Sequence, residues 1–316
     1  MNKKLGNVPV AERTQWLKGA IESLRAMPAI LSSHELSGFM LSLVVMRSSR
    51  ICLEVVDGCY VLWWQRVFGK GTYGSVNTFV LPKKGKGKPE LYIAALSLLG
   101  QHVKVCAIPY ADVAGALAQA CRGTKQDHSC DYVASDLSFG NYEGGSWRSV
   151  RRSLRQPGMR TEVMPLSEAA KVIVPLEQEW LAYSASINKR IDAPVVRWEG
   201  QGVSQLVWWA QNHALLESLG AGVVAVGSFD TEGCYAVQLF CQQSARSFHC
   251  FGRRQIYARR TQHAIYEEMR LAGLHPSFAG MSMNDGEGYA DENNPLNRMK
   301  ARYCDQRATS YSIKPD

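Results

Sequence analysis

The sequence lacks the short motifs by which many nucleotide-dependent and metal-dependent enzymes are identified. It contains no Walker, Rossmann or G-x-S-x-G string. Its nine cysteines form no C-x-x-C pair and its seven histidines form no H-x-x-x-H pair, so the ligand spacing of common zinc sites is missing. We therefore predict no metal site.

Long hydrophobic runs are also missing. The most apolar early stretch, residues 39–46, is far below the ~20 residues that a membrane-spanning helix needs. The basic residues at the start are followed by no apolar segment of a secretion signal. Cys52, Cys106 and Cys241 lie among apolar residues, where reduced cysteines act as small core side chains. These features predict a soluble, cytoplasmic protein with no membrane partner.

The composition is that of an ordinary globular chain with an excess of base. Hydrophobic residues make up 46% and charged residues 20% of the 316 residues, and this length predicts about two domains. The formal net charge of +8 favours acidic partners such as nucleic acid, a phosphorylated ligand or an anionic lipid. A soluble protein that is merely basic is the alternative.

The apolar periodicity predicts an α/β (α+β) protein. A period near 3.6 predicts helices over residues 10–27, 91–99, 111–121, 147–155, 166–182, 203–219 and 258–272, with a kink or break at Pro175. Short apolar runs predict strands over residues 50–56, 59–67, 75–81, 103–108, 161–164, 222–229, 234–243, 247–251 and 278–281. Asp57-Gly58 lies between two of these runs and predicts a hairpin.

Each half of the chain shows the order helix, meander, helix, strand. We interpret this order as a duplicated unit, with one unit over residues 1–160 and the second over residues 161–316. No low-complexity tract or short-period repeat is present.

An arginine-rich helix is the first candidate binding feature. Four arginines at i, i+3, i+4 and i+7 share one helix face, while apolar side chains can anchor another face: Arg148, Arg151, Arg152 and Arg155, with Trp147, Val150 and Leu154. The planar guanidinium fork suits phosphate, so we predict a phosphate or nucleic-acid contact. A solvated basic face, or arginines paired with acids elsewhere, is the alternative.

Two further segments carry candidate residues. The junction between the last meander and the next helix contains Arg253 and Arg254, whose charge is misplaced at a helix N-terminus unless an anion binds there. The segment 280–289, predicted as a polar loop, contains Asn284, Asp285 and Glu287, which could act as a base or hold an ammonium group. A basic surface turn and a plain polar loop are the respective alternatives.

Several of these segments, taken in order, resemble a known family. Asp131-Tyr132-Val133, followed by Gly145 and the basic run 147–152, resembles a motif in the C-terminal domain of phosphatidylglycerol lysyltransferases. Asn284-Asp285-Gly286 and the segment 296–303 resemble a loose version of that family's closing motif. Ala134 departs from the pattern, because a second tyrosine stands there in the family.

The resemblance implies two tandem GNAT-like units, each a mixed sheet flanked by helices, as in the Fem aminoacyltransferases. It implies a transferase that joins an aminoacyl or acyl group to a nucleophile, with the site between the two units. The residues it places there are Arg148, Arg151, Arg152, Asp285, Arg298 and Lys300. The glycines of the GNAT pyrophosphate turn are missing at residues 254–259, which argues against acetyl-CoA as a cofactor.

Two alternatives to a general aminoacyl or acyl transferase stay open. The first is an amino acid:DNA transferase of phage thymine hypermodification, which couples an amino acid to an activated 5-hydroxymethyluracil base. This hypothesis rests on analogy with soluble, basic members of the fold. For the transferase in general, the expected nucleic-acid partner is DNA or tRNA. The second is a non-catalytic nucleic-acid-binding module that uses the same arginines with aromatic stacking.

Overall fold

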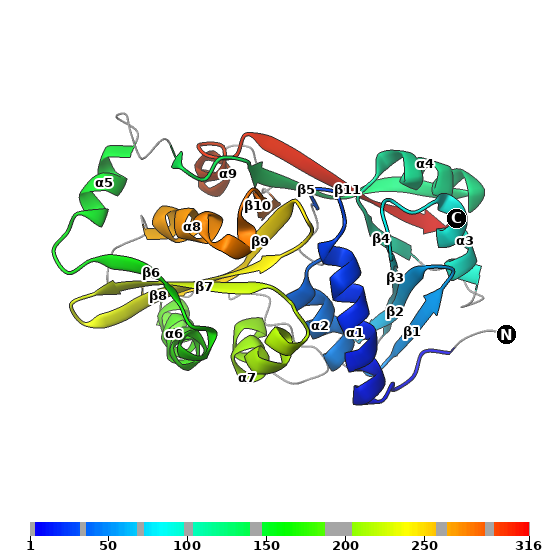
Figure 1. The fold of residues 1–316 in the computed structure, drawn as a ribbon, viewed down its shortest axis with the longest axis horizontal. Helices are drawn as coiled ribbons and strands as arrows, with labels where there is room; N and C mark the ends of the chain where they lie inside the picture. Colours follow the sequence, from blue (N-terminus) through cyan, green and yellow to red (C-terminus); the bar gives the residue numbers. More distant parts are fainter. Residues whose placement is uncertain are drawn as a thin grey trace.

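The described strands of the computed structural model form one mixed sheet of eleven strands, in the order β1-β2-β3-β4-β11-β5-β10-β9-β8-β7-β6 (Figure 1). The structure describes residues 4–31, 36–67, 73–97, 104–139, 147–186, 204–256, 264–287 and 294–315. Among these residues, no helix is long and apolar enough to cross a membrane.

The first half of the chain builds one end of the sheet. Its elements are α1 (Val10–Arg25), α2 (Gly38–Arg47), β1 (Ile51–Val56), β2 (Cys59–Val67), β3 (Tyr73–Pro82), α3 (Pro89–Ser97), β4 (Lys104–Ile108), α4 (Ala111–Ala120) and β5 (Gly123–Ala134). Strands β1 to β3 form an antiparallel meander, and β4 pairs with β3 in parallel. Asp57 and Gly58 close the β1–β2 hairpin with φ angles of 44° and 81°, as a type I′ turn requires.

The second half repeats this order of elements at the other end of the sheet. After α5 (Arg148–Leu154) and β6 (Arg160–Met164) come α6 (Leu166–Ser186), α7 (Gln205–Ser218), β7 (Val223–Asp230), β8 (Gly233–Gln242), β9 (Ser247–Gln255), α8 (Ala264–Leu274), the short 3-10 helix η5 (Pro276–Phe278), β10 (Ser282–Glu287), α9 (Pro295–Lys300) and β11 (Gln306–Pro315). Strands β7 to β9 form an antiparallel meander, and β10 pairs with β9 in parallel. The repeated order confirms the predicted duplicated α/β unit.

The last strand of each half pairs with the other half. Strand β5 ends the first series of elements but pairs with β10, whereas β11 ends the second series and pairs with β4. The two exchanged strands also pair with each other along the centre of the sheet. The two units therefore share one continuous sheet. The predicted boundary between residues 160 and 161 stays a prediction.

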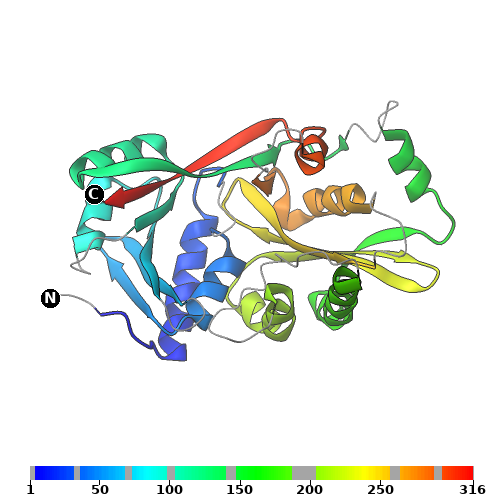
Figure 2. The same cartoon turned by 180° about the vertical axis from the view of Figure 1, so that it is seen from behind.

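The core follows the period-two alternation of the strands. In β2, Leu62 and Trp64 belong to the cluster that α1 and α2 cover, while Val61 and Trp63 belong to the cluster under α3 and α4. The second half behaves alike, with α6 and α7 on one face and α8 on the other. Figures 1 and 2 show α1, α2, α6 and α7 together on one side of the sheet and α8 on the other. Both faces of the sheet are thus buried, as in a layered α/β fold.

The structure corrects four predictions about the elements. The strand predicted at residues 278–281 lies four residues later, because η5 occupies Pro276–Phe278 and β10 takes in most of the predicted polar loop. Two strands were not predicted at all: β11, and β5, which runs from Gly123 to Ala134 and contains the Asp131 motif. Helix α6 continues through Pro175 as one element. Helix α8 is described from Ala264 onward, and the earlier part of that predicted helix lies outside the described residues.

Candidate active site at the exchanged strands

A group of polar side chains gathers where β10 meets the exchanged strand β5. The pairing of β10 with β9 ends at Asn284 and His249. The pairing of β10 with β5 slips between Asn284 and Glu287, which marks a β-bulge, and Gly286 takes a φ of 78°. Bulges of this kind re-aim side chains and are frequent next to active sites. Here the bulge carries Asp285.

The Asp285 carboxylate lies between a tyrosine and a lysine from the chain around α9. The Tyr303 hydroxyl donates a hydrogen bond of 2.6 Å to Asp285 Oδ2, and Lys300 Nζ lies 3.7 Å from the same oxygen. The lysine also donates to the backbone oxygens of Asp285, at 2.5 Å, and Gly286, at 3.3 Å. These bonds fix Lys300, whose side chain is 7% exposed, against the bulge.

Burial raises the pKa of the Asp285 carboxyl above its ordinary value, although the Lys300 charge and the Tyr303 hydroxyl act in the opposite direction. The same burial raises the pKa of Tyr303, to which the neighbouring Asp285 charge also contributes. A buried carboxylate with a raised pKa is a better proton acceptor near neutral pH than an ordinary aspartate. The electrostatics therefore fit Asp285 for general-base chemistry.

A second carboxylate supports the bulge from β5. The Asn284 amide nitrogen donates to Asp131 Oδ2 and to the backbone oxygen of Leu31, both at 2.8 Å. The Asn284 amide oxygen accepts from Gly286 N at 2.7 Å. Asp131 and Asn284 are each 1% exposed. Asn284 thus joins three parts of the chain: Leu31, in the segment after α1, Asp131 on β5, and the bulge at Gly286. These contacts give Asn284 a positioning role.

Aromatic rings line the same region. The Arg307 guanidinium, on β11, lies 3.7 Å from the Tyr132 ring centroid, and Lys300 Nζ lies 5.7 Å from it. Tyr266 of α8 packs edge-on against Tyr303 at 5.8 Å and against Trp147 at 5.0 Å. The stack therefore connects the start of α5 with the Tyr303 side chain at Asp285.

The predicted site residues are brought together only in part. Asn284, Asp285 and Lys300 meet at the bulge. Glu287 ends β10 opposite Asp131, and its side chain lies outside the described residues. Arg298 is exposed on α9. The predicted catalytic and binding roles of these residues stay predictions.

Arg253 and Arg254 do not lie at a helix N-terminus but on strand β9, where each has a carboxylate partner. Arg253 Nε and Nη2 donate to the fully buried Glu268 at 2.5 and 3.0 Å, and Ser228 Oγ also donates to that carboxylate. Arg254 pairs with Glu177 of α6 and lies over the Trp180 ring. Both guanidinium forks are thus engaged within the fold, and residues 257–263, which follow in the chain, lie outside the described residues.

The arginine helix places its charged side chains at the surface. Val150 is buried, with Trp147 and Leu154 packed beside the same core cluster, which confirms the predicted anchor stripe. Arg148, Arg152 and Arg155 are exposed, while Arg151 is half-buried and has an interaction with a neighbour. The glycines before the helix, Gly144 and Gly145, lie outside the described residues.

Three residues of the cluster were not among the predicted site residues. Asp131 and Tyr303 stand in the motifs that carry the family resemblance, so the signal was present in the sequence. Arg307 had no such signal, because it lies on the unpredicted strand β11. Within the described part of the chain, no group of three or more histidine, cysteine, aspartate or glutamate side chains could hold a metal ion.

Among the comparisons with known proteins, only the comparison with solved structures found matches, and these matches concern the fold. No family model matches the chain, and no curated protein matches its sequence. A conserved protein of unknown function from Bacteroides thetaiotaomicron is similar in structure, with a TM-score of 0.71, 11% identity and 99% of each chain covered.

Two further structures connect the fold to named proteins. L-PGS from Bacillus licheniformis has a TM-score of 0.60 at 14% identity, covering 99% of this chain and 94% of that one. The C-terminal domain of a protein assigned as lysylphosphatidylglycerol synthetase from Agrobacterium fabrum has a TM-score of 0.59 at 13% identity, covering 97% and 92%. The fold is therefore the one that these two structures share, as the family resemblance predicted.

Proposed function

We propose that the chain is a transferase that joins an aminoacyl or acyl group to a nucleophile, with Asp285 as the general base. The observation that carries this proposal is the buried Asp285 carboxylate at the β10 bulge, held by Tyr303 and Lys300. The shared fold with a protein assigned as lysylphosphatidylglycerol synthetase supports the reaction class.

The cluster supplies the groups that such a transfer needs. Among the described residues, both side-chain contacts of Asp285 use Oδ2, which leaves Oδ1 for the substrate. An attacking amine forms a bond from nitrogen to the acyl carbon, and the bond from that carbon to the donor's oxygen breaks. The proton of the amine passes to Asp285 and then to the departing oxygen. The Lys300 ammonium, 3.7 Å from Asp285 Oδ2, would stabilise negative charge that develops near the bulge.

The arginines of α5 supplement this site in the proposal. Their exposed side chains would hold a phosphate-bearing donor or acceptor, such as a nucleic acid. The stack from Trp147 through Tyr266 to Tyr303 supports this arrangement, because it joins the root of α5 to the cluster. Positioning both substrates would then supply much of the rate acceleration.

The test is chemical. The full chain is incubated with aminoacyl-tRNA or another activated amino acid and with DNA, tRNA, peptide or lipid acceptors, and each acceptor is analysed by mass spectrometry. We expect one acceptor to gain a group whose mass is that of the amino acid. The Asp285→Asn variant should lose transfer while it keeps its fold, and Asp112→Asn, a matched change at an exposed residue of α4, should keep activity.

Full turnover by Asp285→Asn would remove Asp285 from the mechanism. A modified DNA base would select the amino acid:DNA transferase among the candidates. Salt-sensitive nucleic-acid binding with no transfer to any acceptor would favour the non-catalytic binding module instead.

A further inference from the structure

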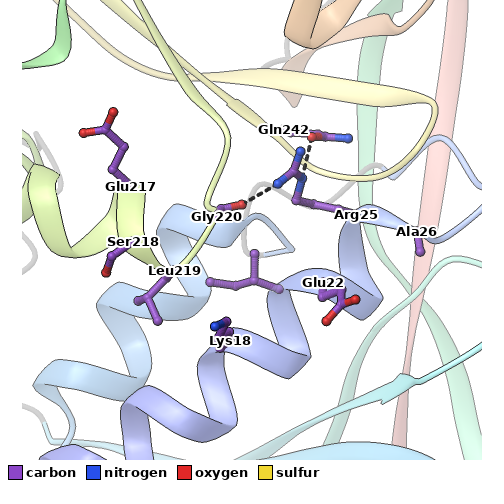
Figure 3. Close-up of a pocket in the computed structure, with 10 residues that line it drawn as sticks. Lys18, Glu22, Arg25, Ala26, Glu217, Ser218, Leu219, Gly220 and Gln242 are labelled. Atoms are coloured by element: carbon purple, nitrogen blue, oxygen red, sulfur yellow. Dashed lines mark hydrogen bonds between the residues drawn. The ribbon is translucent and has the colours of Figure 1, made fainter.

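A pocket of about 600 Å³ lies between α1 and the end of α7, and none of the groups of the candidate active site lines it. One wall is the face of α1 that carries Lys18, Glu22 and Arg25 at i, i+4 and i+7 (Figure 3). The other wall is the chain from Glu217 to Gly220, which leads from α7 towards β7. The pocket is within the size range of small-molecule sites.

Arg25 is fixed in this pocket by neutral acceptors. Its Nε donates to the Gln242 amide oxygen at 2.6 Å, and its Nη1 donates to the Gly220 carbonyl at 2.8 Å (Figure 3). The Gln242 amide is buried and is itself oriented, because its nitrogen donates to the Ser244 carbonyl at 2.9 Å. The guanidinium is thus preorganised before any ligand arrives.

The charge of Arg25 has no carboxylate partner among the described residues, unlike Arg253 and Arg254, which each pair with a glutamate. A guanidinium has five N–H donors, and the contacts within the described chain use two of them. A half-buried arginine with spare donors and an unneutralised charge is suited to a carboxylate.

The pocket also offers sites for a positive group. Glu22 and Glu217 line it, and in the described part of the chain neither makes an ion pair. The carbonyl end of α7 adds partial negative charge at Ser218 to Gly220. Lys18 and Arg25 balance the two glutamates, so the lining holds two charges of each sign.

We propose that this pocket binds a free α-amino acid, with its carboxylate on Arg25 and its ammonium group at Glu217 and the end of α7. The balanced lining selects a zwitterion, because a polyanion would be repelled by the two glutamates and a simple amine by Arg25 and Lys18. This site is separate from the Asp285 cluster and does not rest on the proposed transferase function.

Isothermal titration calorimetry of the full chain tests the site with L-alanine, L-lysine and L-glutamate as probes. Propylamine and propionate each carry one half of the zwitterion and serve as comparison ligands. We expect saturable binding of at least one amino acid and at least about tenfold weaker binding of both half-ligands, which corresponds to about 1.4 kcal/mol.

Two variants examine the two ends of the ligand. Arg25→Met should weaken binding of the amino acid about tenfold or more. Glu217→Gln, which removes no ion pair or side-chain hydrogen bond among the described residues, should weaken it about fivefold. Glu168→Gln changes an exposed glutamate on α6 and should leave binding unchanged. Thermal unfolding shows whether Arg25→Met is folded, and Glu217→Gln remains informative if it is not.

Three results would overturn the proposal. One is the lack of saturable binding by all three amino acids, and another is equal binding of a half-ligand. The third is binding that Glu217→Gln leaves intact and Asp285→Asn abolishes, because the amino acid would then occupy the candidate active site. Unchanged binding by Asp285→Asn supports the separate pocket whether or not the chain proves to be a transferase.

Discussion

Asp285 has a raised carboxyl pKa and lies against the Lys300 ammonium and the Tyr303 hydroxyl. The effect of each neighbour on this pKa can be tested by substitution. Desolvation raises the pKa, while Lys300 and Tyr303 lower it. As the proposed base, Asp285 must be deprotonated to act. The acid limb of the pH–rate profile should therefore lie above the pKa of an ordinary aspartate.

Lys300→Met should move this limb to still higher pH, because the variant removes a positive charge that favours the carboxylate. The measurement is kcat/KM for transfer as a function of pH. A limb that stays in place, or moves to lower pH, would show that the titrating group is not Asp285.

The raised pKa also predicts how stability depends on pH. The folded state holds the Asp285 proton more tightly than the unfolded state, so this group's contribution is fully present below the unfolded pKa and is lost as pH rises through the folded pKa. Asp285→Asn cannot ionise. Its unfolding free energy, relative to the natural chain, should therefore increase as the pH is raised from about 4 to 7. Urea titrations at several pH values measure this, and a flat difference would contradict the predicted shift.

The Arg253–Glu268 pair should contribute to stability rather than to anion binding. Glu268 is fully buried and accepts from both Arg253 and Ser228. Glu268→Gln leaves the guanidinium without its counter-charge and should cost about 3–5 kcal/mol of unfolding free energy. The neighbouring Glu267→Gln, which affects a more exposed pair with Arg270, should cost no more than about 1 kcal/mol. Equal effects in denaturant titrations would show that the buried pair has no special role.

Among the elements, α5 presents a row of exposed arginines that no packing requirement explains. If this face binds a polyanion, each neutralised phosphate releases counterions, and the affinity falls with salt at a log–log slope of ~0.7 to 0.9 per contact. Arg148→Gln combined with Arg152→Gln should flatten that slope by about one to two units in nucleic-acid titrations. Thermal stability should hardly change, because exposed charges contribute little to folding.

Lys171→Gln, at an exposed residue of α6, is the control for removal of a surface charge. If the double variant keeps the salt slope of the natural chain but melts several degrees lower, Arg148 and Arg152 stabilise the fold and do not bind the polyanion.

For the whole molecule, the exchange of β5 and β11 joins the halves into one sheet. Fragment 1–160 contains β4 without β11, and β5 without both of its neighbours. Such a fragment would expose unpaired strand edges, so we expect it to be unfolded or aggregated when it is produced alone. Co-production with fragment 161–316 should restore a soluble complex, measured by size-exclusion chromatography and circular dichroism. A folded, monomeric fragment 1–160 would contradict this dependence.

Much of the fold could be predicted because the signals are local. The Asp57-Gly58 turn, the two meanders and the amphipathic helices depend on side chains a few residues apart, and the structure contains them near the predicted bounds. Strands β10 and β11 were misplaced or missed because each buries polar side chains beside its apolar ones, Met283 in β10 and Ile313 in β11. Ser310 and Ser312 are buried in β11, where Ser310 bonds to Ser129, and Asn284 is buried in β10. Buried polar positions of this kind weaken the hydrophobic alternation by which a strand is recognised.

The sequence by itself determined the α/β class and the duplicated order of elements, and it marked the Asp131 and Asn284-Asp285-Gly286 segments as candidates. Only the tertiary structure decided that these segments meet, because Asn284 bonds to Asp131 across 153 positions of the chain. It also decided that Arg253 and Arg254 face glutamates, and that Arg25 lines a pocket opposite Glu217. The physical reason is that hydrophobic periodicity and turn preferences depend on residues close together in the sequence. The partner of a buried charge instead depends on how elements far apart in the sequence pack together.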